Sequence, residues 1–371
     1  MTVFDAPLFT PRCRAPLRAE TYARARLGAP RSRTIEEVGD VCSPAMSRAS
    51  VTRSALLAAV TLAAVTPTCA PDSRALPPCD ASPALPNVVP GAAVVTVAAV
   101  GDIADCAGGS QMAVATTIEG IKPDAVFALG DLAYPNANID ELVDCYGPSL
   151  GRFRSITRAV PGNHEYHTPH AGAYYAYFCG SSGDAFKGWY SFDIGRWHVV
   201  ALNSNCGGDL DVVSDVADDF GGCDASSPQA AWLRADLDAH PSGCTLAMWH
   251  HPRFSASSEG GSPMVDALWR IIVEHGVDLV LNGHAHSYQR FPRVGVDGLR
   301  DDVNGTRNIV VGTGGVKLAK FSAKEPNRSE MRANDSHGAL RLELREHDYA
   351  WSFVPVNGDM LHDEGTEACR R

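Results

Sequence analysis

The sequence predicts an α/β layer fold, and three observations carry that prediction. From about residue 92, short apolar runs alternate with helix-like segments. In each of the first six of these runs, Asp, Asn, Glu or His is the last residue or directly precedes it. The last part of the chain instead alternates apolar and polar residues. Strands that alternate with helices are typical of α/β layers, in which sites collect at the carboxyl ends of strands.

Each apolar run is short enough to be a buried strand. The seven runs are AAVVTVAAVGD, AVFALGD, ITRAVPGNHE, WHVVALNSN, CTLAMWHHP, VDLVLNGHAH and NIVVGTGG. Between several of them, segments that open with Pro or polar residues predict helices over 110–121, 138–146, 228–239 and 263–275. The segment 338–358 predicts an antiparallel hairpin, with its turn near Glu346 to Asp348, that closes a second sheet.

The first ninety residues differ from the rest in being rich in Arg, Ala, Ser and Pro. Residues 46–65 have a start-like Met46, two arginines and then an apolar run of signal-peptide length. We therefore expect a disordered upstream extension over 1–45, with the true start at Met46, and a signal peptide over 46–70. A linker over 71–91 and a catalytic domain over 92–365 would follow. Lipid attachment at Cys69 stays open as an alternative, although the preceding TPT lacks the small residues such processing prefers.

Composition limits the classes of function that the protein can have and indicates its cellular compartment. The 371-residue chain is 45% hydrophobic and has a formal net charge of −11, so it has no basic footprint for nucleic acid. Eleven cysteines are many for a reducing cytosol, and the eight from Cys79 onward form an even set with no close zinc-type pair. Behind a signal peptide this favours disulfides, with Cys206 and Cys223 closing a Gly/Asp-rich loop.

Five strand ends carry side chains that bind metals. Alone, an Asp after Gly is usually a turn or helix cap, and a His pair is more often a surface feature than a ligand pair. Five such ends in succession are poorly explained as independent caps, so we interpret them as one site. Its members are Asp102, Asp131, Tyr134, Asn163, His164, Glu165, His250, His251, His284 and His286.

The donor set exceeds what one tetrahedral ion uses. Mixed nitrogen and oxygen donors suit first-row ions such as Fe, Mn or Zn, and two ions that share one carboxylate would fit the number. Such a pair polarises a phosphoryl oxygen and lowers the pKa of a bound water. The donors therefore predict hydrolysis of a phosphate ester.

These motifs, in their order, resemble the calcineurin-like metallophosphoesterases. The matching stretches are GDIADC, GDLAY, GNHE, WHHP and GHAH, and the likeness covers roughly residues 93–358. Most of the family has a histidine where this chain has Ala104, whereas the purple acid phosphatase branch has a tyrosine where this chain has Tyr134. The resemblance implies a four-layer α/β/β/α sandwich of two mixed sheets flanked by helices.

The resemblance also implies two metal ions. Asp102, Asp131, Tyr134 and His286 would hold Fe(III), and Asp131 would bridge to Fe(II), Zn(II) or Mn(II) held by Asn163, His250 and His284. Three anionic ligands against +5 of metal leave +2, which suits a phosphate dianion. A metal-bound hydroxide would then attack phosphorus directly, without a phosphoryl-enzyme intermediate.

On the substrate side the resemblance makes His164 the catalytic residue, by hydrogen bonding or by protonating the leaving group. The branch commonly has another histidine where this chain has Glu259. His251 and Arg253 are possible substitutes in substrate binding, or they only shape the loop. Tyr288 and Arg290 are predicted to pack, and GTGG over 312–315 is predicted to be a tight turn lining the site.

The sequence thus predicts an exported acid phosphatase-like enzyme that hydrolyses small phosphate monoesters. A phosphodiesterase or nucleotidase on the same fold stays open as the enzymatic alternative. A non-catalytic metal-binding protein of the cell envelope is the alternative from another class. We expect no nucleic acid partner, and membrane attachment only through a lipid at Cys69.

Overall fold

The computed structural model describes residues 91–184, 187–207, 221–241, 243–323, 328–356 and 361–370. The upstream extension, the signal peptide and nearly all of the linker expected before residue 91 lie outside these residues. Within the described residues, no helix is both long and apolar enough to cross a membrane.

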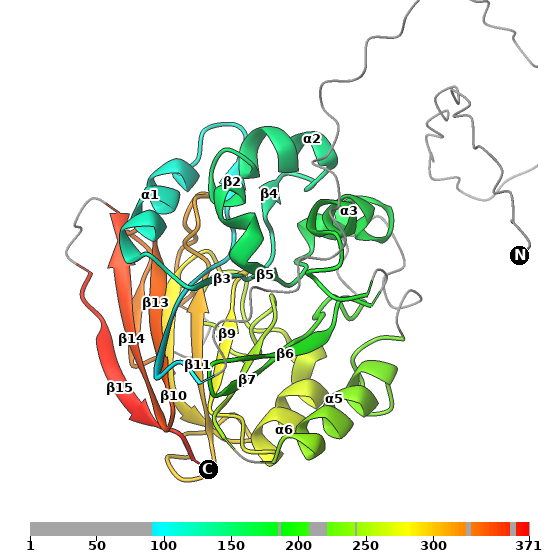
Figure 1. Ribbon diagram of the computed structural model, residues 1–371, viewed down its shortest axis with the longest axis vertical. Coiled ribbons are helices and arrows are strands. Elements are labelled where there is room, and N and C mark those ends of the chain that lie inside the picture. The colour runs from blue at the N-terminus through cyan, green and yellow to red at the C-terminus, as the bar shows by residue number, and fades with distance from the viewer. Residues whose placement is uncertain are drawn as a thin grey trace, which may run out of the picture. The chain divides into compact units, whose positions relative to one another are not determined.

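The first sheet combines a parallel half with an antiparallel half. Its strands run in the order β15-β14-β13-β1-β3-β5 (Figure 1). The parallel strands β1, β3 and β5 are almost entirely buried, as expected of strands covered on both faces. The strands are β1 (Val94–Val100), β3 (Ala125–Ala128), β5 (Thr157–Ala159), β13 (Gly338–Arg345), β14 (Asp348–Pro355) and β15 (Glu364–Ala368).

The second sheet has the order β12-β10-β11-β9-β8-β7-β6, and β7, β8, β9 and β11 are parallel. Antiparallel strands lie at both of its edges, and a separate short pair is formed by β2 (Ala104–Asp105) and β4 (Ala133–Tyr134). Its strands are β6 (Tyr190–Ile194), β7 (Trp197–Ala201), β8 (Thr245–Met248), β9 (Leu279–Asn282), β10 (Tyr288–Val294), β11 (Thr306–Val311) and β12 (Met331–Ala333).

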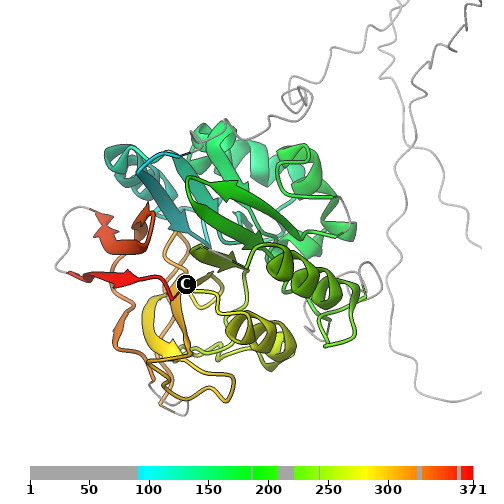
Figure 2. The ribbon, with the colours of Figure 1, turned by 60° about the horizontal axis from the view of Figure 1, so that its bottom comes forward.

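Helices flank the two sheets, and their ends follow local capping rules. The helix α1 (Gln111–Ile121) contacts β13 and β14, whereas α5 (Pro228–Ala239) and α6 (Asp266–Glu274) lie side by side against the other sheet (Figures 1 and 2). Ser227 caps α5 by accepting from the Ala230 N–H, with Pro228 at the first helical position. Among the described residues the other α-helices are α2 (Ile139–Glu141), which runs on into a π-helical turn (Leu142–Tyr146), and α3 (Gly172–Phe178). Short 3-10 helices lie at Leu150–Ile156, His164–His167, Pro169–Ala171 and Pro263–Val265.

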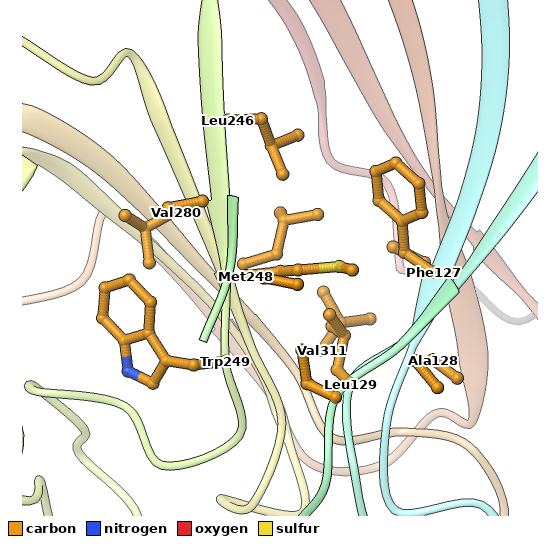
Figure 3. Close-up of a cluster of buried hydrophobic side chains, with 14 of the residues drawn as sticks. Phe127, Ala128, Leu129, Leu246, Met248, Trp249, Val280 and Val311 are labelled. Carbon is orange, nitrogen blue, oxygen red and sulfur yellow. The ribbon is translucent and has the colours of Figure 1, made fainter. Parts of the chain in front are cut away.

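The space between the sheets is filled by large apolar side chains. Figure 3 shows Phe127 of β3 facing Leu246 and Met248 of β8, with Trp249 and Val280 on the other side of β8. All five side chains are fully buried. Burying side chains of this size contributes about 1.5–3 kcal/mol each, so the two sheets pack as one unit around a shared core.

The prediction of two mixed sheets flanked by helices is confirmed. All seven apolar runs contain a strand, and helical residues occupy each of the four predicted helical segments. The sequence missed α3 and six strands, namely β2, β4, β6, β10, β12 and β15. The hairpin over 338–358 is confirmed, but its place was wrong. β13 pairs with β1 through six residue pairs from Val94↔Arg345 to Ala99↔Leu340, so the hairpin extends the first sheet and does not close the second.

Disulfides join segments of the two-sheet unit that are far apart in the sequence. Cys206 bonds to Cys223, as predicted, and among the described residues bridges also join Cys106 to Cys145 and Cys244 to Cys369. The last bridge spans 125 residues and fastens the end of the chain to the start of β8. These bonds are consistent with folding in an oxidising compartment.

Candidate metal centre

The predicted site forms where the carboxyl ends of the parallel strands from both sheets meet. Backbone hydrogen bonds join the two sets of strand ends: the Gly101 N–H after β1 donates to Val311 at the end of β11, with 2.9 Å between the atoms. His250 Nδ1, after β8, lies 2.7 Å from the Leu129 carbonyl oxygen, after β3. The edge at which the donors gather is therefore shared between the sheets.

One group of donors surrounds the phenol oxygen of Tyr134. Tyr134 Oη lies 3.0 Å from Asp102 Oδ1, 2.9 Å from Asp131 Oδ2 and 3.1 Å from His286 Nε2. Ligand atoms of Asp102, Asp131 and His286 lie within 4.8 Å of one another. Two carboxylates, a phenol and an imidazole thus converge on one point, a donor set that suits a hard, highly charged ion.

A second group of donors lies beside the first. Ligand atoms of His250, His251 and His284 also lie within 4.8 Å of one another. His250 Nε2 is 3.2 Å from Asp131 Oδ2, so Asp131 touches both groups. Both His250 Nε2 and Asn163 Oδ1 are buried and lack a hydrogen-bond partner among the described residues. Buried polar atoms normally have a hydrogen-bond partner. Two unpaired atoms at this place are therefore suited to be ligands of a bound cation.

Four of these residues adopt backbone angles that side chains rarely take. The φ angles are 60° at Asp102, 51° at Asp131, 66° at His284 and 21° at His286. A non-glycine residue in the left-handed region costs of the order of 1–2 kcal/mol, and such residues cluster at functional sites. Each follows the end of a parallel strand, where the left-handed turn redirects the side chain toward the common centre.

Gly283 contributes to the site through its missing side chain and not through an unusual backbone conformation. The positive φ angles of this turn belong to His284 and His286. Gly283 is needed because a Cβ there would lie 2.7 Å from the Leu129 carbonyl oxygen and 2.9 Å from Asp102 Oδ2. The missing side chain lets the two sheets approach closely at the site.

The charges within the site shift the pKa values of its histidines and of Tyr134. Although burial opposes protonation, Asp131 raises the pKa of His250 to about 9, and Asp102 raises the pKa of His286 to about 9. His284 behaves oppositely, because burial and the neighbouring His250 lower its pKa to about 4. Burial and the two carboxylates raise the pKa of Tyr134 well above its usual value. A tyrosinate here therefore requires a strong cation.

Glu165 organises the turns that carry the donors. Its buried carboxylate accepts hydrogen bonds from the backbone N–H groups of Asp131, Leu132 and Gly162, at 2.9, 2.9 and 2.6 Å. Burial, followed by the charge of Asp131, raises its pKa to about 7. The sequence placed Glu165 at the site without a role, and the structure shows that it joins the turn after β3 to the turn after β5.

His164 lies at the open side of the site. Its Nδ1 contacts the Pro135 carbonyl oxygen, and its ring packs on Tyr134 with 4.1 Å between ring centroids. A carbonyl only accepts, so Nδ1 carries the hydrogen and Nε2 faces Asp131 Oδ2 at 3.9 Å. The side chain is 21% exposed, so a small ligand can reach Nε2 from solvent.

A family model described as calcineurin-like phosphoesterase matches residues 95–288, which is more than half of the chain. The chain belongs to this family. The match begins in β1 and ends at the start of β10, so it includes every strand end that supplies a predicted ligand.

Within the calcineurin-like phosphoesterase family, the curated relatives that this chain matches include purple acid phosphatases. Purple acid phosphatase 15 of Arabidopsis thaliana is 29% identical over 56% of this chain and 43% of its own length. A relative from the same plant, named as inactive, is 26% identical over 66% of this chain and 43% of its own. The chain spans about two fifths of the length of these relatives.

Solved structures support the same fold. A purple acid phosphatase from yellow lupin (Lupinus luteus) seeds superposes with a TM-score of 0.58, at 18% identity, over 75% of this chain and 55% of its own. The structure of PhoD superposes with a TM-score of 0.52, at 14% identity, over 76% of this chain and 71% of its own. At these identities the likeness concerns the fold.

The two tentative substrate contacts of this member of the calcineurin-like phosphoesterase family lie in different places. His251 is buried within the second donor group, and its Nδ1 lies 2.9 Å from Ser204 Oγ. Arg253 Nε instead donates to Asp266 at 3.0 Å, and Arg253 lines a separate cavity of about 270 Å³ with Phe254 and Arg328. A role for either residue toward substrate stays a prediction.

Other candidates from the sequence are packed away from the site or line it. Tyr288 is buried and donates to Asp363 at 2.7 Å, and Arg290 pairs with the same carboxylate. Gly312 of the GTGG turn does line the site, since a Cβ there would lie 2.8 Å from Asp102 Oδ2. A polar residue soon after a predicted strand was the signal that identified the other site residues. The same signal could have identified Ser204, which follows β7 and accepts a hydrogen bond from the His251 backbone N–H.

Proposed function

We propose that this chain hydrolyses phosphate monoesters at a centre of two metal ions. The observation that carries the proposal is the position of Asp131, whose Oδ2 lies 2.9 Å from Tyr134 Oη on one side and 3.2 Å from His250 Nε2 on the other. One carboxylate between two donor groups is what a shared ligand of two adjacent ions requires.

The residues present fit two cations of different character. Asp102, Asp131, Tyr134 and His286 would hold Fe(III), because two carboxylates and a phenolate favour a hard trivalent ion. Asp131, Asn163, His250 and His284 would hold Fe(II), Zn(II) or Mn(II). When bound, the ions supply Lewis acidity toward the phosphoryl oxygens and lower the pKa of water.

Side chains of the protein would position the shared carboxylate and protonate the leaving oxygen. Glu165 holds the turn of Asp131 through two backbone N–H groups, so the shared carboxylate keeps its orientation. His164 Nε2 faces the same carboxylate from the solvent side. With Nδ1–H fixed on Pro135, Nε2 is the ring atom turned toward the site, and when the ring also carries a proton on Nε2 it can donate that proton to the leaving oxygen and return to the neutral form.

Export is part of the proposal. Residues 46–65 have the features of a signal peptide, and the disulfides Cys106–Cys145, Cys206–Cys223 and Cys244–Cys369 support an oxidising compartment. We place the protein outside the cytoplasm, secreted or in the cell envelope, with a lipid at Cys69 as the only route to a membrane.

A comparison of two chromogenic substrates tests the reaction class. We expect kcat/KM to be higher for p-nitrophenyl phosphate than for bis(p-nitrophenyl) phosphate, because a centre of net charge +2 binds the dianion more strongly. Higher kcat/KM for the diester would replace a monoesterase with a phosphodiesterase. A protein that takes up metal but hydrolyses neither ester would favour the non-catalytic cell-envelope alternative.

One observation favours the phosphodiesterase as second candidate. The charge of Glu259 contributes to raising the pKa of His286, so this carboxylate lies within electrostatic reach of the first donor group. A negative charge there repels a monoester dianion more than a diester monoanion. Glu259→Gln should therefore raise kcat/KM for the monoester relative to the diester, and an unchanged ratio would remove this argument.

Colour tests the proposed ligand at Tyr134. We expect the iron-loaded protein to be purple near neutral pH through charge transfer from tyrosinate to Fe(III). Tyr134→Phe should abolish the visible band, whereas Tyr146→Phe, which changes a buried tyrosine outside the donor groups, should keep it. A band that survives Tyr134→Phe would show that the phenolate is not a ligand.

A further inference from the structure

One buried histidine lies between two carboxylates where α5 meets the β6–β7 hairpin. His198, the second residue of β7, is 7% exposed. Its Nδ1 lies 2.9 Å from Asp193 Oδ1 on β6, and its Nε2 lies 2.7 Å from Asp236 Oδ2 on α5. The metal centre lies beyond the carboxyl ends of the strands, whereas His198 lies near the start of β7. The group is therefore separate from the metal centre.

The hydrogen bonds of His198 specify its protonation state. Ionised carboxylates only accept hydrogen bonds, so each contact needs a hydrogen on the ring nitrogen. A neutral imidazole carries one N–H, whereas the protonated ring donates from both nitrogens. Burial opposes protonation, but the hydrogen bonds to Asp236 and Asp193 outweigh it and raise the pKa of His198 above its usual 6.5. His198 is therefore a cation between two carboxylates at neutral pH, and we call Asp193, His198 and Asp236 the His198 triad.

The groups packed against the His198 ring favour a single positive charge at this place. The His240 ring stacks on His198, with 3.8 Å between centroids and 14° between planes. His240 Nδ1 donates to the Asp236 carbonyl oxygen at 2.7 Å, and a second cation at this separation from His198 would be repelled, so the neutral form of His240 is the compatible one. In the strand register His198 pairs with Thr245 of β8, which carries no charge. On β6, Ser191 donates to Asp236 Oδ1 at 2.7 Å.

The two ends of α5 are held by different kinds of contact. Asp236 lies in the last turn of α5, so the His198 triad fastens the C-terminal end of the helix to the hairpin. At the N-terminal end, the Gln229 side chain accepts from the Asn203 N–H and donates to the Asn203 carbonyl oxygen, at 2.8 Å each. An amide does not titrate, whereas an imidazole does. The attachment of the C-terminal end alone therefore depends on the protonation of His198.

We propose that the His198 triad is a pH-sensitive tie that holds the C-terminal end of α5 on the β6–β7 hairpin. From about pH 5 to neutrality the protonated ring bridges both carboxylates. When the ring loses one proton to solvent, one carboxylate loses its donor and the positive charge between the two anions disappears, so the end of α5 is held less tightly. Since the folded pKa is raised, the stabilisation is complete below the unfolded pKa of about 6.5 and is lost as the pH rises through the folded pKa.

Urea unfolding between about pH 5 and pH 9 tests the tie through His198→Gln. The urea midpoint of wild type should exceed that of the variant most at the acidic end, and this difference should shrink as the pH rises. His275→Gln is the matched control, because His275 is 21% exposed and faces the exposed Asp238 at 3.5 Å. Its difference from wild type should change little with pH. A difference for His198→Gln that is the same at every pH would overturn the proposal.

A local probe and a second variant keep the test decisive if His198→Gln does not fold. Amide hydrogen exchange of wild type, corrected for its intrinsic dependence on pH, should show residues 236–240 losing protection as the pH rises, whereas the helix near Gln229 keeps its protection. Asp236→Asn leaves His198 one carboxylate, so protection of 236–240 should be lower than in wild type at acidic pH and should depend less on pH. Protection that changes equally at both ends of α5, or an Asp236→Asn variant that behaves as wild type, would contradict the tie.

Discussion

At the scale of single residues, the candidate metal centre depends on groups that bind no metal. Glu165 gathers three backbone N–H groups from two turns, and Gly283 leaves room for the Leu129 carbonyl. Four of the residues expected to bind metal have a strained, left-handed backbone conformation. The surrounding hydrogen bonds offset that strain, so we expect changes at Glu165 to be felt at the ligands.

Glu165→Gln should lower both stability and metal retention. The amide keeps the volume of Glu165 but offers one acceptor oxygen, so a backbone N–H of Asp131, Leu132 or Gly162 loses its acceptor. A buried unsatisfied group costs about 1–3 kcal/mol. Urea unfolding and metal analysis measure the two effects.

Glu141→Gln is the control for Glu165→Gln. Glu141 is less buried and accepts from two backbone N–H groups, those of Asn136 and Asn138, outside the donor groups. The Glu141→Gln variant should lose less stability than Glu165→Gln and should retain as much metal as wild type. If the two variants retained metal equally, Glu165 would have no positioning role.

His164→Ala should reduce kcat by about 10²–10⁴-fold while the metal content stays that of wild type, because a proton donor is lost and no ligand is removed. His167→Ala is its neighbour control. His167 Nδ1 also contacts Pro135, at 2.8 Å, so its loss perturbs the same loop without removing the proton donor. Steady-state kinetics with p-nitrophenyl phosphate decide the matter, and equal losses in the two variants would contradict a catalytic role for His164.

At the scale of secondary-structure elements, ion pairs made by the last strand, β15, join the two sheets. Glu367 on β15, in the first sheet, accepts from Arg307 on β11 at 2.7 Å and from Arg293 on β10, both in the second sheet. Tyr349 on β14 donates to it at 2.8 Å. β15 is an edge strand, and this contact fastens it across the sheets.

The same contact predicts how stability depends on pH. Burial opposes ionisation of Glu367, but the hydrogen bonds from Arg307 and Arg293 outweigh it, so its pKa lies below the usual 4.5. A lowered carboxyl pKa stabilises the folded state above pH 4.5, and this stabilisation is lost as the pH falls through the folded value. Glu367→Gln should therefore cost roughly 1–2 kcal/mol at pH 7, after allowance for solvent screening, and progressively less below pH 4.5.

Urea unfolding across this pH range checks the prediction, with Glu364→Gln on the same strand as control. Glu364 is exposed, so its replacement should have little effect at any pH. If Glu367→Gln lowered the free energy of unfolding by the same amount at every pH, the ion pairs of Glu367 would not be the source of that loss.

At the scale of the whole molecule, disulfides hold together segments that are far apart in the sequence. Cys244–Cys369 spans 125 residues and Cys206–Cys223 spans 17. A longer closed loop removes more entropy from the unfolded chain. The first bond therefore constrains a large part of the two-sheet unit, and the second constrains one loop.

Replacing Cys244 and Cys369 together by Ser should lower the free energy of unfolding by about 2–4 kcal/mol. Replacing Cys206 and Cys223 by Ser should cost roughly 2 kcal/mol less, because the closed loop is shorter. Equilibrium unfolding without reductant measures both. The opposite order would mean that native contacts, and not chain entropy, determine the difference.

The sequence by itself determined the fold class, the parallel strands and the identity of the donors. These are local properties: a short apolar run predicts a buried strand, and the residue after it is read directly. The assignment of seven of those donors to two ions is a prediction that the converging geometry supports. The family follows from the same local motifs.

Only the tertiary structure decided how these parts meet. It placed the 338–358 hairpin beside β1, made Glu165 a link between two turns, and showed that Gly283 is needed for close approach. It also joined Asp193, His198 and His240, which no motif connects. Each of these depends on contacts between residues tens to hundreds of positions apart, and strand pairing and side-chain convergence at that range are set by packing rather than by local pattern.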